Sequence, residues 1–175
     1  VTGTQVTRAP VPQGARQLAF HFSPPLGVIV RETNKQSNNF MAEQLLKTLG
    51  AEKVGRPGTW PKGVQAVAGF LEGIGIGPGG YRLQNGSGLY DADRFSAAQI
   101  VGLLRAIYRD FRVAADFVGS LAIAGTDGTM GRRMEQGLAE RYVRAKTGTL
   151  NGVSTLSGYA GAPGHLPLAF SILMN

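Results

Sequence analysis

The sequence predicts an α+β fold, in which helical segments come first and a run of antiparallel strands follows. Apolar residues recur at helical spacing in several segments before residue 120, whereas the segments after residue 139 alternate or are continuously apolar. Short links that contain glycine join the last apolar segments, which favours an antiparallel meander. No repeat or linker divides the chain, so we expect one unit over residues 1–175, irregular over residues 1–17.

Helices are predicted from the spacing of apolar residues and from the residues at the helix ends. A helix over residues 40–49 has Ser37 or Asn39 as a suitable N-cap, and Gly50 marks its end. The motif Ser96-Ala-Ala-Gln99 is a capping box and begins a helix that extends to about residue 111. The other predicted helical segments begin at residues 26–30 or cover residues 62–74 and 113–118, with one further turn over 131–136.

Strands are predicted where side chains alternate in polarity or form a short apolar run. In the segment 140–147, Arg144 and Lys146 lie on one face, while Val143 and Ala145 lie on the other. The other predicted strands cover residues 16–22, 81–84, 153–160 and 166–174. The last is almost entirely apolar, which is typical of a buried strand.

Composition excludes several classes of function. The chain has no cysteine, and its two histidines, His21 and His165, are far apart in the sequence, so we expect no metal and no cofactor. No apolar stretch is long enough to cross a membrane. The formal charge of +7 permits a nucleic acid partner, but the basic residues form no run. A basic nucleic-acid binder therefore stays an alternative without a motif to support it.

The segment Lys146-Thr147-Gly148-Thr149 ends one of the predicted strands. A lysine there presents an ammonium group, Thr147 and Thr149 offer hydroxyl donors, and Gly148 allows close approach of another backbone. Such a group of donors suits a carboxylate or a β-lactam carbonyl. The three letters K-T-G are also compatible with an ordinary surface strand end.

The segment Ser37-Asn38-Asn39 lies just before a predicted helix. A serine hydroxyl beside a cation can pass a proton, and an asparagine amide can hold a substrate carbonyl. Helix capping explains the same residue types. The order of the two segments is more informative, because an S-x-N element followed by K-T-G belongs to the signature of serine β-lactamases and penicillin-binding proteins.

Further blocks extend this similarity from about residue 18 to the end of the chain. In sequence order they are Ser23-Pro-Pro-Leu26, Asn39-Phe-Met-Ala-Glu43, Asn85-Gly-Ser-Gly-Leu89, Gly125-Thr-Asp-Gly-Thr129, Arg144 to Leu150 and Ser157-Gly-Tyr-Ala-Gly161. Together they resemble the penicillin-binding protein 4 type D-alanyl-D-alanine carboxypeptidases/endopeptidases of the S13 family. The resemblance implies the penicillin-binding, β-lactamase-like α+β core, an antiparallel sheet with packed helices, present here as the C-terminal portion of the catalytic domain.

The resemblance also implies roles for individual residues. Ser37 corresponds to the serine that relays a proton, Asn39 to the residue that orients the substrate amide, and Lys146 to the lysine that supports the relay. Thr147, Gly148 and Thr149 correspond to the segment that receives the terminal carboxylate of the peptide. The implied substrates are peptidoglycan stem peptides, the implied inhibitors are β-lactams, and the implied location of the parent is the periplasm.

The chain departs from the family pattern in two ways. Asn38 stands where the family usually has aspartate, which removes one charge beside the site. No serine in the chain is followed by lysine three residues later, so the S-x-x-K element that supplies the nucleophile is absent. We therefore expect a fragment whose nucleophile lies elsewhere, which is inactive alone and needs the missing N-terminal segment or a second copy to cover apolar surface.

Two other functions are compatible with the same motifs. A class C β-lactamase-like hydrolase shares the architecture, but its middle motif usually begins with tyrosine where this chain has Ser37. A non-catalytic module that holds peptidoglycan or penicillin is favoured by the missing S-x-x-K element.

Overall fold

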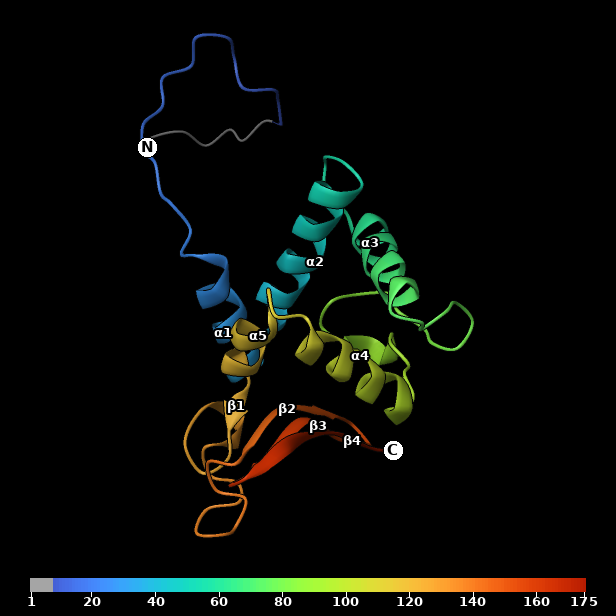
Figure 1. The fold of residues 1–175 in the computed structure, drawn as a ribbon. Coiled ribbons are helices and arrows are strands. Elements are labelled where there is room, and N and C mark those ends of the chain that lie inside the picture. Colours follow the sequence, from blue (N-terminus) through green and yellow to red (C-terminus); the bar gives the residue numbers. More distant parts are fainter. Residues whose placement is uncertain (1–7) are drawn as a thin grey trace.

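The computed structural model describes residues 8–175 and packs a group of helices against an antiparallel sheet (Figure 1). The elements in chain order are α1 (Leu26–Gln36), α2 (Asn39–Lys53), α3 (Trp60–Gly73), η1 (Leu89–Asp91), α4 (Ala97–Arg109), α5 (Ala114–Ser120), β1 (Ala122–Ile123), η2 (Gly128–Met130), β2 (Val143–Leu150), β3 (Val153–Ala162) and β4 (His165–Met174). None of the helices in residues 8–175 combines the length and apolar character that a bilayer crossing requires.

The sheet is an antiparallel meander with the strand order β1-β2-β3-β4, as the sequence predicts. In the β2–β3 pair, Ala145 lies opposite Gly158 and Lys146 lies opposite Ser157. This register puts Lys146 on the face opposite that of the buried Val143 and Ala145. The two-residue strand β1 was not predicted, because it is too short to show any periodicity.

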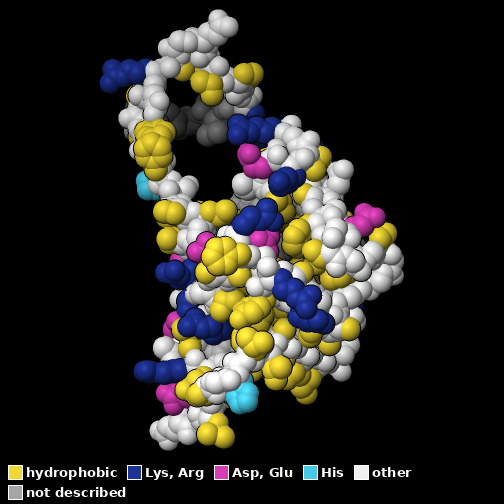
Figure 2. All heavy atoms as spheres, in the orientation of Figure 1, with side chains coloured by type: hydrophobic (Ala, Val, Ile, Leu, Met, Phe, Trp, Pro, Cys, Tyr) yellow, Lys and Arg dark blue, Asp and Glu magenta, His cyan; other side chains and the backbone are white. Residues whose placement is uncertain are grey.

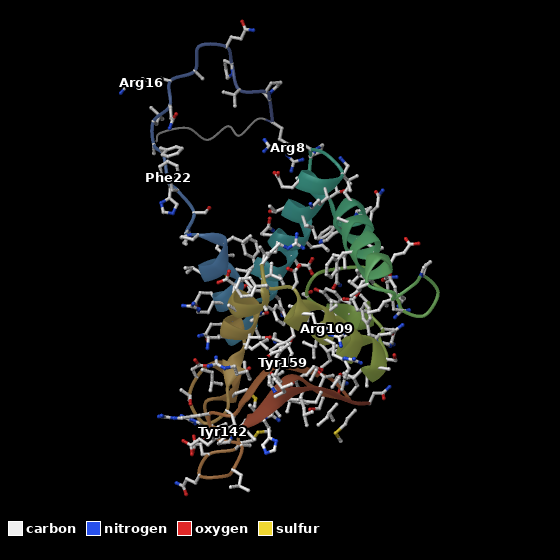
Figure 3. The ribbon with its side chains drawn as sticks, in the orientation of Figure 1. Arg8, Arg16, Phe22, Arg109, Tyr142 and Tyr159 are labelled. Atoms are coloured by element: carbon white, nitrogen blue, oxygen red, sulfur yellow. The ribbon has the colours of Figure 1, made fainter. Side chains whose placement is uncertain are left out.

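Two apolar clusters fix the sheet. One lies where β1, η2 and β2 meet and contains Ala122, Met130 and Ala145, all fully buried. The other joins the sheet to α4 through Leu104, Leu121 and Tyr159. The Tyr159 hydroxyl donates a hydrogen bond to the carbonyl of Leu104 at 2.7 Å, across the interface between β3 and α4 (Figure 3).

Helix caps explain the boundaries of α2 and α4. The capping box at Ser96 is confirmed, since its side chain accepts from Gln99 N and the Gln99 side chain accepts from Ser96 N. The predicted caps of α2 are wrong, because Asn38 is the N-cap and its side chain accepts from Met41 N. Gly50 does not end this helix: it lies inside α2, where a Cβ would come within 2.5 Å of Gly63 N in α3.

Three local predictions are wrong. Residues 16–22 form no strand, because no described strand lies alongside them to complete their hydrogen bonds, and Phe22 extends away from the helices and the sheet (Figure 3). Residues 81–84 contribute a single bridge between Arg82 and Arg94. Residues 131–136 form turns in place of a helical turn. Of the irregular stretch expected over residues 1–17, residues 1–7 lie outside the described part of the chain, and residues 8–17 contain no helix or strand.

The last strand forms as predicted but is not buried. Ala169 of β4 packs toward Leu104 and Tyr159, whereas Leu168 and Ile172 on the other face are 72% and 51% exposed. The continuous apolar run reflects two apolar faces, of which helix α4 covers only one.

Candidate functional site

The two segments singled out in the sequence meet in the structure. Nζ of Lys146 donates a hydrogen bond to Oγ of Ser37 at 2.7 Å, although the two residues are 109 positions apart. Ser37 is the residue that ends α1, with φ 54° and ψ 49°, and Lys146 lies in the middle of β2. The fold therefore brings a serine hydroxyl and a lysine ammonium together from separate elements.

The environment of Lys146 favours proton chemistry at Ser37. The ammonium group also donates to the carbonyl of Thr147 at 2.6 Å, and burial lowers the pKa of Lys146 from its usual value. An ammonium group can only donate, so the Ser37 oxygen accepts from it and the Ser37 hydroxyl proton stays free for a third group. A nearby positive charge stabilises negative charge that develops on the serine oxygen as it passes a proton.

The remainder of the K-T-G-T segment continues along β2 beside this pair. Oγ1 of Thr147 donates a hydrogen bond to Oγ1 of Thr129 at 2.8 Å, and Thr149 is exposed. Gly148 pairs with Thr155 of β3, and a Cβ at Gly148 would come within 2.4 Å of the Thr155 hydroxyl. A side chain at position 148 would therefore require the Thr155 hydroxyl to rotate away.

Asn39 begins α2 and lines an open pocket of about 610 Å³. The other lining residues are Phe40, Glu43, Trp60, Gln84, Asn85, Ser87, Leu89, Tyr90 and Ala92. Amide groups and aromatic rings thus surround the candidate residue two positions after Ser37. Asn38, which replaces the usual aspartate of the family, uses its side chain to cap α2.

Glu43 holds one wall of this pocket in place, a role that sequence reasoning did not assign. One carboxylate oxygen accepts from Trp60 Nε1 at 2.7 Å and Gly86 N at 3.1 Å, and the other accepts from Ser87 N at 3.0 Å. Burial acts to raise the pKa of the carboxyl group, but the hydrogen bonds, led by those from Ser87 and Gly86, outweigh burial and lower the pKa. No residue pattern near Glu43 signals these partners, which lie more than 15 positions away.

A second missed interaction ties the loop 125–129 to α1. The Asp127 carboxylate accepts from Lys35 Nζ through one oxygen and from Ile123 N at 2.8 Å through the other. Lys35 lies two positions before Ser37, and Ile123 is in β1, which pairs with β2. This ion pair fixes the end of α1 against the strand edge beside Lys146. The motif Gly125 to Thr129 pointed to this loop without indicating the partner of Asp127.

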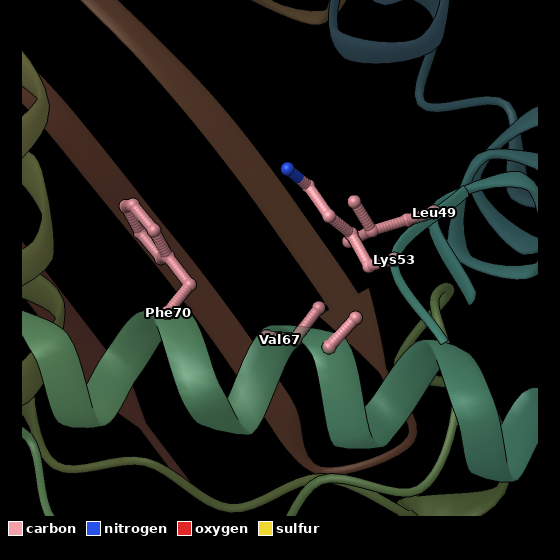
Figure 4. A pocket seen from close by; sticks show the side chains of 5 residues that line it. Leu49, Lys53, Val67 and Phe70 are labelled. Carbon is pink, nitrogen blue, oxygen red and sulfur yellow. The ribbon is translucent and has the colours of Figure 1, made fainter. Parts of the chain in front are cut away.

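The remaining features do not extend the site. A hollow of about 490 Å³ between α2 and α3 is lined by Leu49, Lys53, Ala66, Val67 and Phe70, none of which belongs to the candidate set (Figure 4). Residues 8–175 bring no three metal-binding side chains together. On the face shown in Figure 2, basic side chains are dispersed among hydrophobic ones and form no continuous stripe.

Known proteins are similar to this chain in sequence and in fold. A D-alanyl-D-alanine carboxypeptidase from Actinomadura sp. (strain R39) is 40% identical over 168 residues, which cover 93% of this chain and 31% of that protein. A crystal structure of penicillin-binding protein 4 from Haemophilus influenzae superposes with a TM-score of 0.82 at 29% identity, covering 94% of this chain and 36% of that chain. The same Haemophilus protein complexed with a novel β-lactam matches at 30% identity with the same TM-score, covering 94% of this chain and 39% of that chain.

The chain thus spans about a third of the length of these relatives. Over residues 1–175 it matches the D-Ala-D-Ala carboxypeptidase 3 (S13) family from end to end. The α+β architecture and the family resemblance that the sequence indicated are both confirmed, and the chain belongs to the D-Ala-D-Ala carboxypeptidase 3 (S13) family.

Proposed function

We propose that this chain supplies the proton-relay and substrate-binding part of the active site of a serine-type D-Ala-D-Ala carboxypeptidase/endopeptidase. The longer protein that contains it, called the parent below, supplies the nucleophilic serine. The observation that carries the proposal is the hydrogen bond of 2.7 Å between Lys146 Nζ and Ser37 Oγ. The relatives with these names are about three times longer than the chain, which leaves room for the missing S-x-x-K element.

In the proposed reaction, the nucleophilic serine attacks the carbonyl carbon between the last two D-alanines of a peptidoglycan stem peptide. Ser37 passes the proton released by the nucleophile to the leaving amine nitrogen, the C–N bond breaks, and an acyl-enzyme ester remains. Water then hydrolyses the ester by the reverse proton path. Lys146 keeps positive charge next to the Ser37 oxygen throughout.

Substrate binding falls to the residues around this pair. The hydroxyl groups of Thr147 and Thr149 and the backbone at Gly148 lie along β2, where the terminal carboxylate of the peptide would be received. Asn39 orients the substrate amide from the start of α2. β-Lactams mimic the same peptide, and the complex of the Haemophilus relative with a β-lactam supports their assignment as inhibitors.

The test is fluorescent penicillin labelling of the chain and of the parent, with mass mapping of the acylated peptide. We expect label on the parent alone, at a serine outside this chain. In the parent, Ser37→Ala should slow labelling by about a hundredfold, whereas Ser154→Ala, an exposed serine on β3, should leave it unchanged. Label on a serine of the isolated chain would overturn the proposal.

A second candidate is a non-catalytic module that binds peptidoglycan or penicillin. The absence of S-x-x-K from the chain favours it. A parent that binds penicillin reversibly, without a covalent adduct, would select this alternative. Because peptidoglycan stem peptides lie outside the cytoplasmic membrane, we further propose that the parent is exported to the periplasm, which cell fractionation tests.

A further inference from the structure

A hydroxyl group outside the Lys146–Thr149 segment lies at the proposed carboxylate site. Oγ1 of Thr129 accepts the hydrogen bond that Thr147 Oγ1 donates, at 2.8 Å, and Thr129 is exposed. We infer, on the basis of the proposed function, that Thr129 is a further substrate-binding residue whose hydroxyl receives the terminal carboxylate of the peptide together with Thr147.

The hydrogen atoms of the pair explain this role. Thr147 uses its hydroxyl proton on Thr129, so the proton of Thr129 is left to point outward from the exposed side of the pair. A carboxylate has two oxygens with about four acceptor positions. When it arrives, the Thr147 hydroxyl can turn to one oxygen while Thr129 donates to the other. Two adjacent hydroxyl donors 2.8 Å apart therefore match one carboxylate.

The position of Thr129 is fixed by contacts on both sides of it. Met130, the next residue, is fully buried in the cluster between β1 and β2. Gly128, the residue before, has φ +55°, and a Cβ there would lie 2.6 Å from the carbonyl oxygen of Lys35. The loop therefore rests directly on the last turn of α1, which carries Ser37, so Thr129 and the relay serine share one rigid support.

Charge near Thr129 is compatible with an anionic ligand. The nearest carboxylate in the loop, Asp127, is paired with Lys35. Burial acts to raise the pKa of Asp127, but the Lys35 hydrogen bond and the nearby positive charges of Lys35 and Arg144 lower it. The negative charge of Asp127 is thus offset by cations, which limits its repulsion of an incoming carboxylate.

The test compares two substrates in the parent protein. Both are N-acyl-D-alanine thioesters; one has thioglycolate as its leaving group and so carries a carboxylate, and the other has ethanethiol and carries none. We expect wild type to prefer the thioglycolate ester. Thr129→Val should lower kcat/KM for that ester about tenfold, as expected for one lost hydrogen bond to a charged group, and leave the ethyl thioester within about twofold.

Two further variants separate binding from folding. Thr129→Ser keeps the hydroxyl and should restore the preference. Thr126→Val removes a hydroxyl of the same loop, one that donates to the Ala124 carbonyl. This variant should leave kcat/KM unchanged for both thioesters. A Thr129→Val variant that retains the full preference, or that loses both activities equally, would overturn the inference. So would turnover by wild type without any preference. No turnover of either thioester by wild type would overturn the proposed function and this inference with it.

Discussion

Replacing Glu43 by glutamine tests whether one carboxylate holds the pocket wall beside Asn39. Glutamine keeps only one oxygen acceptor, and its NH2 group takes the place of the other oxygen. In one orientation the NH2 group faces the donor Ser87 N; in the other it faces the two donors Trp60 Nε1 and Gly86 N. At least one hydrogen bond to a charged acceptor is lost and two donors are brought together. For a half-buried group this costs about 1.5 kcal/mol, which corresponds to roughly tenfold faster exchange of the released amide.

Hydrogen exchange read by mass spectrometry on the parent measures this directly, in peptides that cover residues 84–90. The matched control is Glu52→Gln in the same helix, whose exposed pairing with Arg56 at 3.7 Å involves no residue of the 84–90 segment. The folded pKa of Glu43 lies below 4.5, so its contribution is present above pH 4.5 and is lost as the pH falls through the folded pKa. The difference in amide exchange rate between Glu43→Gln and wild type should therefore shrink as the pH falls below 4.5. Exchange in Glu43→Gln within twofold of wild type at pH 7 refutes the role.

Three shorter predictions address the relay, the core and the open face. Lys146→Met should reduce turnover by the parent about a hundredfold or more without lowering its melting temperature, because burial already penalises the ammonium group. Tyr159→Phe should cost about 1 kcal/mol in a urea titration, because the buried Leu104 carbonyl loses a hydrogen bond. The double variant Leu168→Lys, Ile172→Lys should reduce self-association of the isolated chain, measured by sedimentation velocity. Unchanged sedimentation would show that the exposed apolar face of β4 does not mediate self-association.

Elements with a self-contained signal were predictable from the sequence. The capping box at Ser96 carries both of its partners within four residues, and α4 begins where it predicts. The alternation of Val143 and Ala145 with Lys146 fixed the orientation of β2, since a strand has only two faces. Short, local rules of this kind need no knowledge of the rest of the fold.

Features that depend on distant neighbours were not predictable. Gly50 reads as a helix end, but close packing of α2 on α3 requires glycine there. The apolar run of β4 predicts burial, but coverage depends on which elements lie on each face. Gly86 and Ser87, which bind Glu43, and Lys35, which pairs with Asp127, lie more than 40 positions from their partners, so no local pattern indicates these contacts. In the site, the motifs identified Ser37 and Lys146, and only the fold shows that the two side chains meet.

The backbone at Ser37 connects local strain with the proposed chemistry. Ser37 adopts a left-handed conformation at the end of α1, which glycine tolerates freely and other residues adopt at a cost of about 1 kcal/mol. Its N–H bonds to the Thr33 carbonyl, and the next residue, Asn38, caps α2. A local preference for glycine is thus overridden at the residue whose hydroxyl meets Lys146, as expected where function constrains a sequence.

Comparing Ser37→Gly with Ser37→Ala in the parent separates the two effects. Both variants lack the hydroxyl, so both should lose labelling by fluorescent penicillin to a similar extent. Only glycine relieves the backbone, so Ser37→Gly should be more stable to urea than Ser37→Ala by about 1 kcal/mol. If the alanine variant were the more stable one, the left-handed geometry would not be strained, and the choice of serine would reflect the hydroxyl alone. If glycine retained labelling, the Ser37 hydroxyl would not be the proton relay.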